Sequence, residues 1–132
     1  MAGFTNYMAS KMTDHFTNKT AYTAATAYYV GLSTAVPNDG GTVTEITGNG
    51  YARGTVIGTS WGAATNGTAA YGAAVAFPAC SGTAWGTVSH FHFYDATASG
   101  TMLGWGSLGT NQSIPVGGTA SFASGALTLS ID

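Results

Sequence analysis

The chain has 132 residues, which predicts one domain that is long enough to bury a sizeable core. Only 6% of the residues are Asp, Glu, Lys or Arg, and the formal net charge is −2. Three cations cannot form a basic patch, which argues against nucleic acid and anionic membranes as partners. A surface with so little charge favours a protein that packs against copies of itself or against another partner.

Apolar residues at helical spacing predict an amphipathic helix over residues 4–17, within an N-terminal arm at 1–20. Gly3 or Thr5 is expected to open it. The apolar face has two open interpretations, because it can dock on its own domain or contact a neighbouring subunit. The candidate interface residues on this face are Phe4, Tyr7, Met8, Met12 and Phe16.

Residues 21–132 alternate between short runs of β-branched or aromatic residues and clusters of Gly, Pro, Asn and Asp. This spacing predicts seven or eight short strands in an all-β, antiparallel β-sandwich or jelly-roll-like domain, preceded by the short helix. The expected strands lie within 26–33, 42–57 (broken at 48–50), 69–78, 85–95, 101–108 and 114–132.

The segment 89–95, SHFHFYD, is the one stretch that suggests chemistry. Strand alternation puts His90 and His92 on one face, and Phe91 and Phe93 on the other as core residues. A zinc site needs further ligands, and no histidine follows His92. We therefore expect surface or interface histidines, with no metal, no cofactor and no catalytic residue. A cupin-like metal-binding enzyme remains an alternative.

Five other residues have expected structural roles. Pro37 presets a turn, and Asp39 with Gly40 supplies left-handed backbone freedom in that turn. Arg53 is the only strong cation of the β body, and it is expected to pair with Glu45 or with an acid of a neighbouring subunit.

The three tryptophans, Trp61, Trp85 and Trp105, are expected to be core anchors or buried interface contacts. Trp85 and Trp105 flank the same predicted hairpin, so they are predicted to stack across it. The lone Cys80 is expected to be a small buried residue.

Four stretches together resemble a family of small bacteriophage virion proteins, which are tail-fibre-like, head-decoration or cement proteins. The stretches are 4–16, 27–56 (with YVGLSTAVPNDGG and GNGYARG), 74–108 and 125–132. The resemblance implies a structural protein that is made in the host cytoplasm and placed on the outer surface of the phage head. Its implied partners are the major capsid protein, whose subunits it would bridge, and copies of itself in a dimer or trimer. The alternative is a tail-associated or fibre-like virion protein. His92 departs from the family pattern, where a small or apolar residue is expected.

Overall fold

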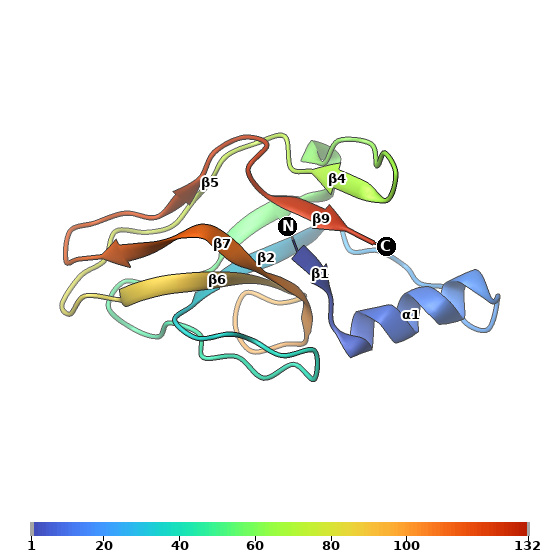
Figure 1. Cartoon of the computed structure of the whole chain (residues 1–132), viewed down its shortest axis with the longest axis horizontal. Coiled ribbons are helices and arrows are strands. Elements are labelled where there is room, and N and C mark those ends of the chain that lie inside the picture. The colour runs from blue at the N-terminus through green and yellow to red at the C-terminus, as the bar shows by residue number, and fades with distance from the viewer. Residues whose placement is uncertain (1, 132) are drawn as a thin grey trace.

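The computed structural model describes residues 2–131, and these form a β-rich fold with one α-helix near the N-terminus (Figure 1). The predicted class is confirmed. The helix is α1 (Asn6–Phe16), and a turn of 3₁₀ helix, η1, spans Gly58–Ser60. The strands are β1 (Ala2–Phe4), β2 (Ala27–Ser33), β3 (Gly54–Ile57), β4 (Thr68–Ala70), β5 (Val75–Ala76), β6 (Gly86–Tyr94), β7 (Met102–Ile114), β8 (Ser121–Phe122) and β9 (Thr128–Ser130).

Within residues 2–131, seven strands form one sheet in the order β3-β2-β6-β7-β1-β9-β4. All neighbours are antiparallel except β1 and β9, which run parallel and meet at Ala2 and Leu129. The remaining two, β5 and β8, form a separate antiparallel ribbon. The ribbon makes a second layer, because Phe122 of β8 contacts Phe91 of β6 with ring centroids 5.6 Å apart.

The large sheet curls until the chain beyond one edge meets the other edge. After β3 and η1, Trp61 forms an antiparallel bridge with Tyr71, just beyond β4. The N–H of Gly62 donates to the carbonyl of Ala70 at 2.9 Å, and the N–H of Gly72 donates to that of Ser60 at 2.7 Å. These bonds occupy backbone groups that an open sheet would offer to another chain.

The core lies inside the curl, under the ribbon. Phe91 and Phe93, both predicted to be core residues, are 4% and 5% exposed, and their rings meet edge to face at 5.8 Å. Trp61 packs against Phe93 at 6.1 Å. Cys80 is buried as expected. No helix among the described residues is long and apolar enough to cross a membrane.

Several strand predictions need correction. The segment 69–78 was expected to hold one strand, but it contains the end of β4 and, after a break, β5, which belongs to the separate ribbon. The segment 42–47 was expected to be a strand, but it makes only an isolated bridge between Ser33 and Glu45. The hairpin partner of β6 continues to Ile114 rather than ending at 108. The chain also begins with a strand, β1, which pairs with β7 and so places the start of the predicted arm inside the main sheet.

Candidate interaction surface and buried histidine cluster

Helix α1 is fixed to the sheet at its first turn. The backbone N–H of Thr5 donates to the carbonyl of Leu103 at 2.9 Å, and its hydroxyl donates to that of Met102 at 2.8 Å. The same hydroxyl accepts from the N–H of Met8 at 3.5 Å, which caps the helix. The helix therefore begins after Thr5, and Phe4, predicted to be helical, lies at the end of β1.

The loop at 36–41 supports the start of α1 from the other side. The carbonyl of Asp39 accepts from the N–H of Asn6 at 2.9 Å, while its carboxylate accepts from Nε1 of Trp105 at 2.9 Å. Pro37 is buried in this loop. The predicted left-handed residue is one position off, because Gly41, with φ +93°, adopts that conformation rather than Gly40.

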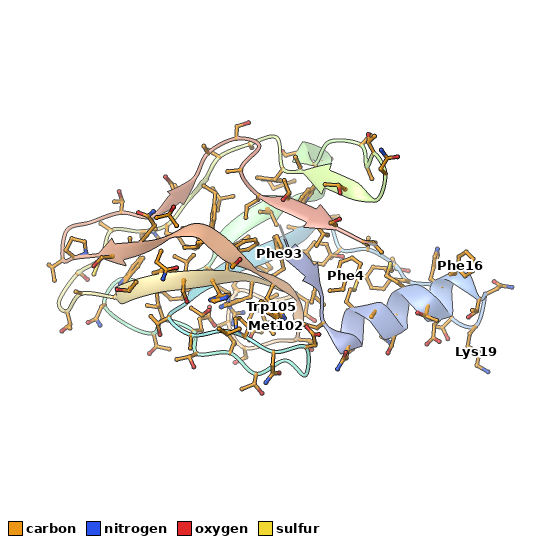
Figure 2. All side chains as sticks on the ribbon, in the orientation of Figure 1. Phe4, Phe16, Lys19, Phe93, Met102 and Trp105 are labelled. Atoms are coloured by element: carbon orange, nitrogen blue, oxygen red, sulfur yellow. The ribbon has the colours of Figure 1, made fainter. Side chains whose placement is uncertain are left out.

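The predicted interface face is buried at one end and exposed at the other. Met8, Met12 and Phe16 follow one another at intervals of four and make a stripe along α1, while Phe4 precedes them in β1. Met8 is 6% exposed against the core, whereas Phe16 is 90% exposed. Figures 1 and 2 show why: α1 extends away from the sheet, and Phe16 lies near its far end. Tyr7, at 45% exposure, lies outside the core.

An apolar hollow of about 260 Å³ opens where α1 leaves the curled sheet. Its lining is almost free of polar groups, and it includes Phe4, Met8, Tyr28, Trp61, Leu103 and Leu129. We call this cavity the apolar hollow. Such a hollow can accept an apolar side chain from outside, which removes apolar surface from water.

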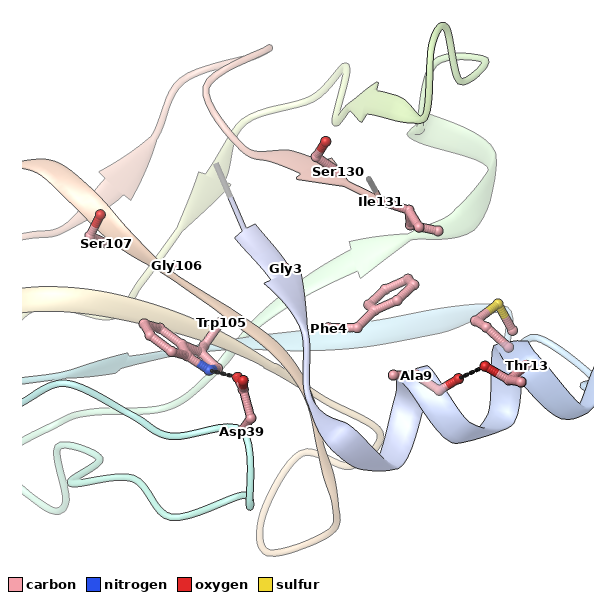
Figure 3. Close-up of a pocket in the computed structure, with 11 residues that line it drawn as sticks. Gly3, Phe4, Ala9, Thr13, Asp39, Trp105, Gly106, Ser107, Ser130 and Ile131 are labelled. Atoms are coloured by element: carbon pink, nitrogen blue, oxygen red, sulfur yellow. Dashed lines mark hydrogen bonds between the residues drawn. The ribbon is translucent and has the colours of Figure 1, made fainter.

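A second depression, of about 600 Å³, lies between α1 and the strands β7, β1 and β9 (Figure 3). Its lining mixes apolar and hydroxyl-bearing side chains, including Met12, Thr13, Trp105, Ser130 and Ile131. Together with the hollow, this groove borders the apolar stripe of α1, of which only Phe16 is exposed. Two depressions therefore lie beside the base of α1, and of these only the hollow is almost wholly apolar.

Both histidines of β6 are expected from the sequence to lie at a surface or interface, but His92 is buried, whereas His90 is half-buried. His92 has an exposed fraction of 0%, and neither ring nitrogen has a hydrogen-bond partner among residues 2–131. Its ring lies against Gly31 of β2, where a Cβ would fall 2.1 Å from Cε1 of His92. The ring also meets that of Tyr94 edge to face, with centroids 5.3 Å apart.

A buried ion pair lies beside His92, which settles the choice for Arg53 in favour of Glu45 of its own chain. Nε of Arg53 donates to Oε1 of Glu45 at 2.8 Å, and Nη2 donates to Oε2 at 2.7 Å. The side chains of Arg53 and Glu45 are only 5% and 16% exposed. The guanidinium lies 3.6 Å from the ring centroid of Tyr94, and the hydroxyl of Tyr51 donates to Glu45 at 2.7 Å.

These contacts shift the pKa values of the cluster. Burial disfavours the Glu45 carboxylate, but hydrogen bonds from Arg53 and Tyr51 outweigh it and hold its pKa below the usual range. Burial raises the pKa of Tyr51, and the bond to Glu45 adds to this. Burial lowers the pKa of His92 to about 4, because the imidazolium would lose its hydration. At neutral pH the cluster holds one matched charge pair and an uncharged histidine.

The two histidines of the motif have separate environments. Nδ1 of His90 lies 2.7 Å from the hydroxyl of Ser89, and its ring centroid is 5.9 Å from that of Trp105. No group of three or more His, Cys, Asp or Glu side chains arranged to hold a metal occurs between residues 2 and 131. The pair therefore does not form part of a larger donor set in this described region.

The predicted stacking of Trp85 on Trp105 is wrong. Trp105 lies opposite His92 in the hairpin register. Trp85 lies at the other end of β7, where its backbone N–H donates to the carbonyl of Ile114. The indole of Trp85 instead meets Tyr51 edge to face at 5.4 Å. Its buried position agrees with the predicted role as a core anchor.

Sequence reasoning missed Tyr51, which joins the ion pair to the core. Its hydroxyl accepts from the N–H of Leu32 at 2.9 Å as well as donating to Glu45. The spacing of Tyr51 and Arg53 carried a signal, since residues two apart in extended chain point to the same side. The apolar hollow was also missed, because its lining comes from strands far apart in sequence.

The fold and surfaces describe a small β-rich protein with a buried ion pair in its interior and an apolar hollow at the base of a projecting helix. The chain matches a family described as "Podophage GP4 fiber I protein gp80" over residues 3–130. The chain belongs to this family and is a bacteriophage virion structural protein. No curated protein matches the chain.

Proposed function

We propose that the chain is a structural subunit of a phage tail fibre or its attachment, and that it acts by packing rather than by chemistry. The match to a podophage fibre family over residues 3–130 is the observation that carries this proposal. It favours the tail-associated alternative over the head-decoration role that the sequence first suggested. Decoration of the head, with the major capsid protein as partner, is the competing outcome of the test below.

The mechanism is burial of apolar surface between rigid subunits. Apolar surface gains about 25 cal/mol for each Å² removed from water, and a typical interface buries about 1,600 Å² in total. Much of that gain is offset by lost motion and by ordering of side chains, so a rigid subunit binds better than a flexible one. The buried Arg53–Glu45 pair and the curled sheet supply that rigidity.

Copy number and position in the particle test the proposal together. Quantitative mass spectrometry of purified virions, with the capsid protein as internal reference, is expected to find a small number of copies per particle. Gold-labelled antibody against the chain is expected to mark the tail in electron micrographs. Hundreds of copies per particle, with label spread over the head, would overturn the fibre assignment in favour of decoration.

Removal of the gene gives an independent functional readout. Particles that lack the chain are expected to keep stable, DNA-filled heads but to adsorb poorly to their host. Complementation with the wild-type gene is the control. Particles that adsorb normally but lose DNA on dilution or heating would contradict the fibre role, because that phenotype indicates a weakened shell.

A further inference from the structure

We propose that the groove between α1 and the strands β7, β1 and β9 binds an uncharged saccharide, with the indole of Trp105 as the surface on which a sugar ring stacks (Figure 3). We call it the Trp105 groove. This inference deepens the proposed function, on which it rests, because it names the class of host-surface molecule that a tail-fibre subunit would hold.

The indole of Trp105 is held in place by the protein itself. Its Nε1 donates to Oδ1 of Asp39 at 2.9 Å, and its ring centroid lies 5.9 Å from that of His90. The side chain is nevertheless partly exposed and lines the groove. A side chain that is already fixed loses little conformational freedom on binding, so less of the contact energy is offset by ordering.

The space beside the indole on the β1 side is open. Gly3 of β1 pairs with Trp105 of β7, so the two positions share one face of the sheet. Because β7 lies between β6 and β1, His90 is on one flank of Trp105 and Gly3 is on the other. A Cβ added at Gly3 would meet no heavy atom within 4 Å apart from its own chain neighbours. In a groove of about 600 Å³, this leaves room for a ring-sized ligand against the indole.

The rim of the groove supplies hydroxyls and one carboxylate. Oδ1 of Asp39 accepts the indole N–H, and this exposed carboxylate has a second oxygen that can accept from a ligand hydroxyl. Ser107 lies two residues from Trp105 on the same side of β7 and is exposed. Thr13 of α1 and Ser130 of β9 add hydroxyls from two further elements. A sugar ring has the complementary pattern, with C–H groups over its faces and hydroxyls around its edge.

The charge of the groove disfavours an ionic ligand. Among residues 2–131, no Lys, Arg or His side chain lines it, and Asp39 is its one acid. An anion such as phosphate would meet this carboxylate with no cation to offset the repulsion. A cation would gain little from one exposed carboxylate, because water and salt screen the attraction. An uncharged polyol uses both the indole and the hydroxyls, and therefore fits the lining best.

Titration of sugars into the purified full chain, followed by ¹H–¹⁵N NMR, tests the site directly. The probes are maltose, cellobiose, lactose and N,N′-diacetylchitobiose, each up to about 50 mM, together with polysaccharide extracted from the host surface. The chain has three tryptophans, and Trp105→Phe identifies the indole N–H signal of Trp105 by its loss. At least one probe is expected to shift this signal, with a dissociation constant of about 1 mM for an open groove, and to leave those of Trp61 and Trp85 in place. No shift with any probe overturns the proposal.

Gly3→Val blocks the groove without disturbing the strand. Gly3 does not have a positive φ, an added Cβ there meets no clash, and valine is favoured in strands. This variant is expected to weaken sugar binding at least about tenfold, because the valine methyl groups occupy the space beside the indole.

Gly109→Val is the matched control. Gly109 also lies in a strand, β7, without a positive φ and with no heavy atom within 4 Å of an added Cβ, but it does not line the groove. It is expected to bind sugar as the wild type does, and both variants are expected to keep the wild-type melting temperature. Sugar binding that survives Gly3→Val, or that both variants weaken equally, contradicts the proposed site.

Salt and charged probes test the class of ligand. Sugar binding is expected to change less than about twofold between about 50 and about 500 mM NaCl, because no ion pair contributes to it. Inorganic phosphate and tetramethylammonium are expected to leave the Trp105 signal unchanged. A larger response to either ion than to every sugar overturns the saccharide assignment.

Phage that carry the same two substitutions connect the site to the host surface. Gly3→Val phage are expected to adsorb at least about tenfold more slowly than Gly109→Val phage, because many weak contacts on one particle act together. Normal adsorption of Gly3→Val phage would show that the sugar bound in solution is not the host-surface ligand. The outcome is separable from that of the proposed function: a chain that labels the tail but binds no sugar refutes only the site, and a chain that binds sugar in this groove but occupies the head refutes only the fibre assignment.

Discussion

His92 is expected to make the stability of this protein depend on pH. The histidine is completely buried, and burial lowers its pKa from 6.5 to about 4. In the unfolded chain the imidazole regains its ordinary pKa and binds a proton more readily than it does in the folded chain. Protons therefore favour unfolding, and stability is lost as the pH falls through the window from 6.5 to about 4.

The magnitude follows from the difference between the two pKa values. Each unit corresponds to about 1.4 kcal/mol, so the whole window is worth about 3 kcal/mol. Between about pH 8 and about pH 5 the expected loss is about 2 kcal/mol. Glu45 is the charged group that faces His92 from the loop, and its pKa is also lowered in the folded protein. Its protonation therefore also destabilises the fold, but mainly below pH 4.5, the ordinary pKa of this group. A measurement that stops at about pH 5 isolates the histidine.

Urea unfolding of the wild type and of His92→Leu, followed by tryptophan fluorescence at several pH values, measures this dependence. The wild type is expected to lose about 2 kcal/mol more of its free energy of unfolding over this range than the leucine variant does. The readout is the change of the free energy of unfolding with pH, so a loss of stability that is the same at every pH does not affect the conclusion. Parallel pH profiles for the two proteins would refute the reasoning, because His15 and His90 are present in both.

Three further substitutions test the contacts around this cluster and the helix start. Arg53→Met is expected to lower the free energy of unfolding by about 3–5 kcal/mol, because it leaves the Glu45 carboxylate buried without its partner. The addition of Glu45→Leu is expected to recover most of this loss. A double-mutant cycle measured by urea denaturation checks both values. Thr5→Ala is expected to cost about 2 kcal/mol through the lost cap and an unpaired carbonyl, whereas Thr5→Ser, which keeps the hydroxyl, costs less than half as much by the same assay. Gly31→Ala is expected to lower the melting temperature by roughly 5–10 °C, because the new Cβ would overlap the His92 ring. His92→Ala in the same chain is expected to restore part of the lost melting temperature. If it restores none, the predicted overlap with His92 is wrong.

The sequence predicts the hairpin of β6 and β7 best, since its strands alternate clearly and its turn at 96–100 contains Ser99 and Gly100, both with positive φ. The helix is also predicted, with an error at its start. Phe4 has the right spacing for the helical face, but pairing of β1 with β7 outweighs local periodicity. A three-residue strand carries too little pattern to be recognised.

The burial of His92 could not be predicted from alternation alone. Alternation correctly separates His92 from Phe91 and Phe93, but it does not say whether the second face is covered. The cover comes from the long connection between β2 and β3, whose residues Glu45 and Arg53 lie far from β6 in sequence. The ion pair itself was anticipated, but its position over the histidine depends on three-dimensional packing that no local signal reports.

The parallel pairing of β1 and β9 has a mechanical consequence. These strands carry the two ends of the described residues, and they lie side by side as the fifth and sixth of the seven strands, between β7 and β4. A pull on the two ends would slide β1 along β9 and β7, and β9 along β4. The hydrogen bonds that run across β1–β7 and β9–β4 resist such sliding together rather than one by one. Tension through the termini is therefore borne along a direction in which the sheet is stiff, where a terminal hairpin would unzip.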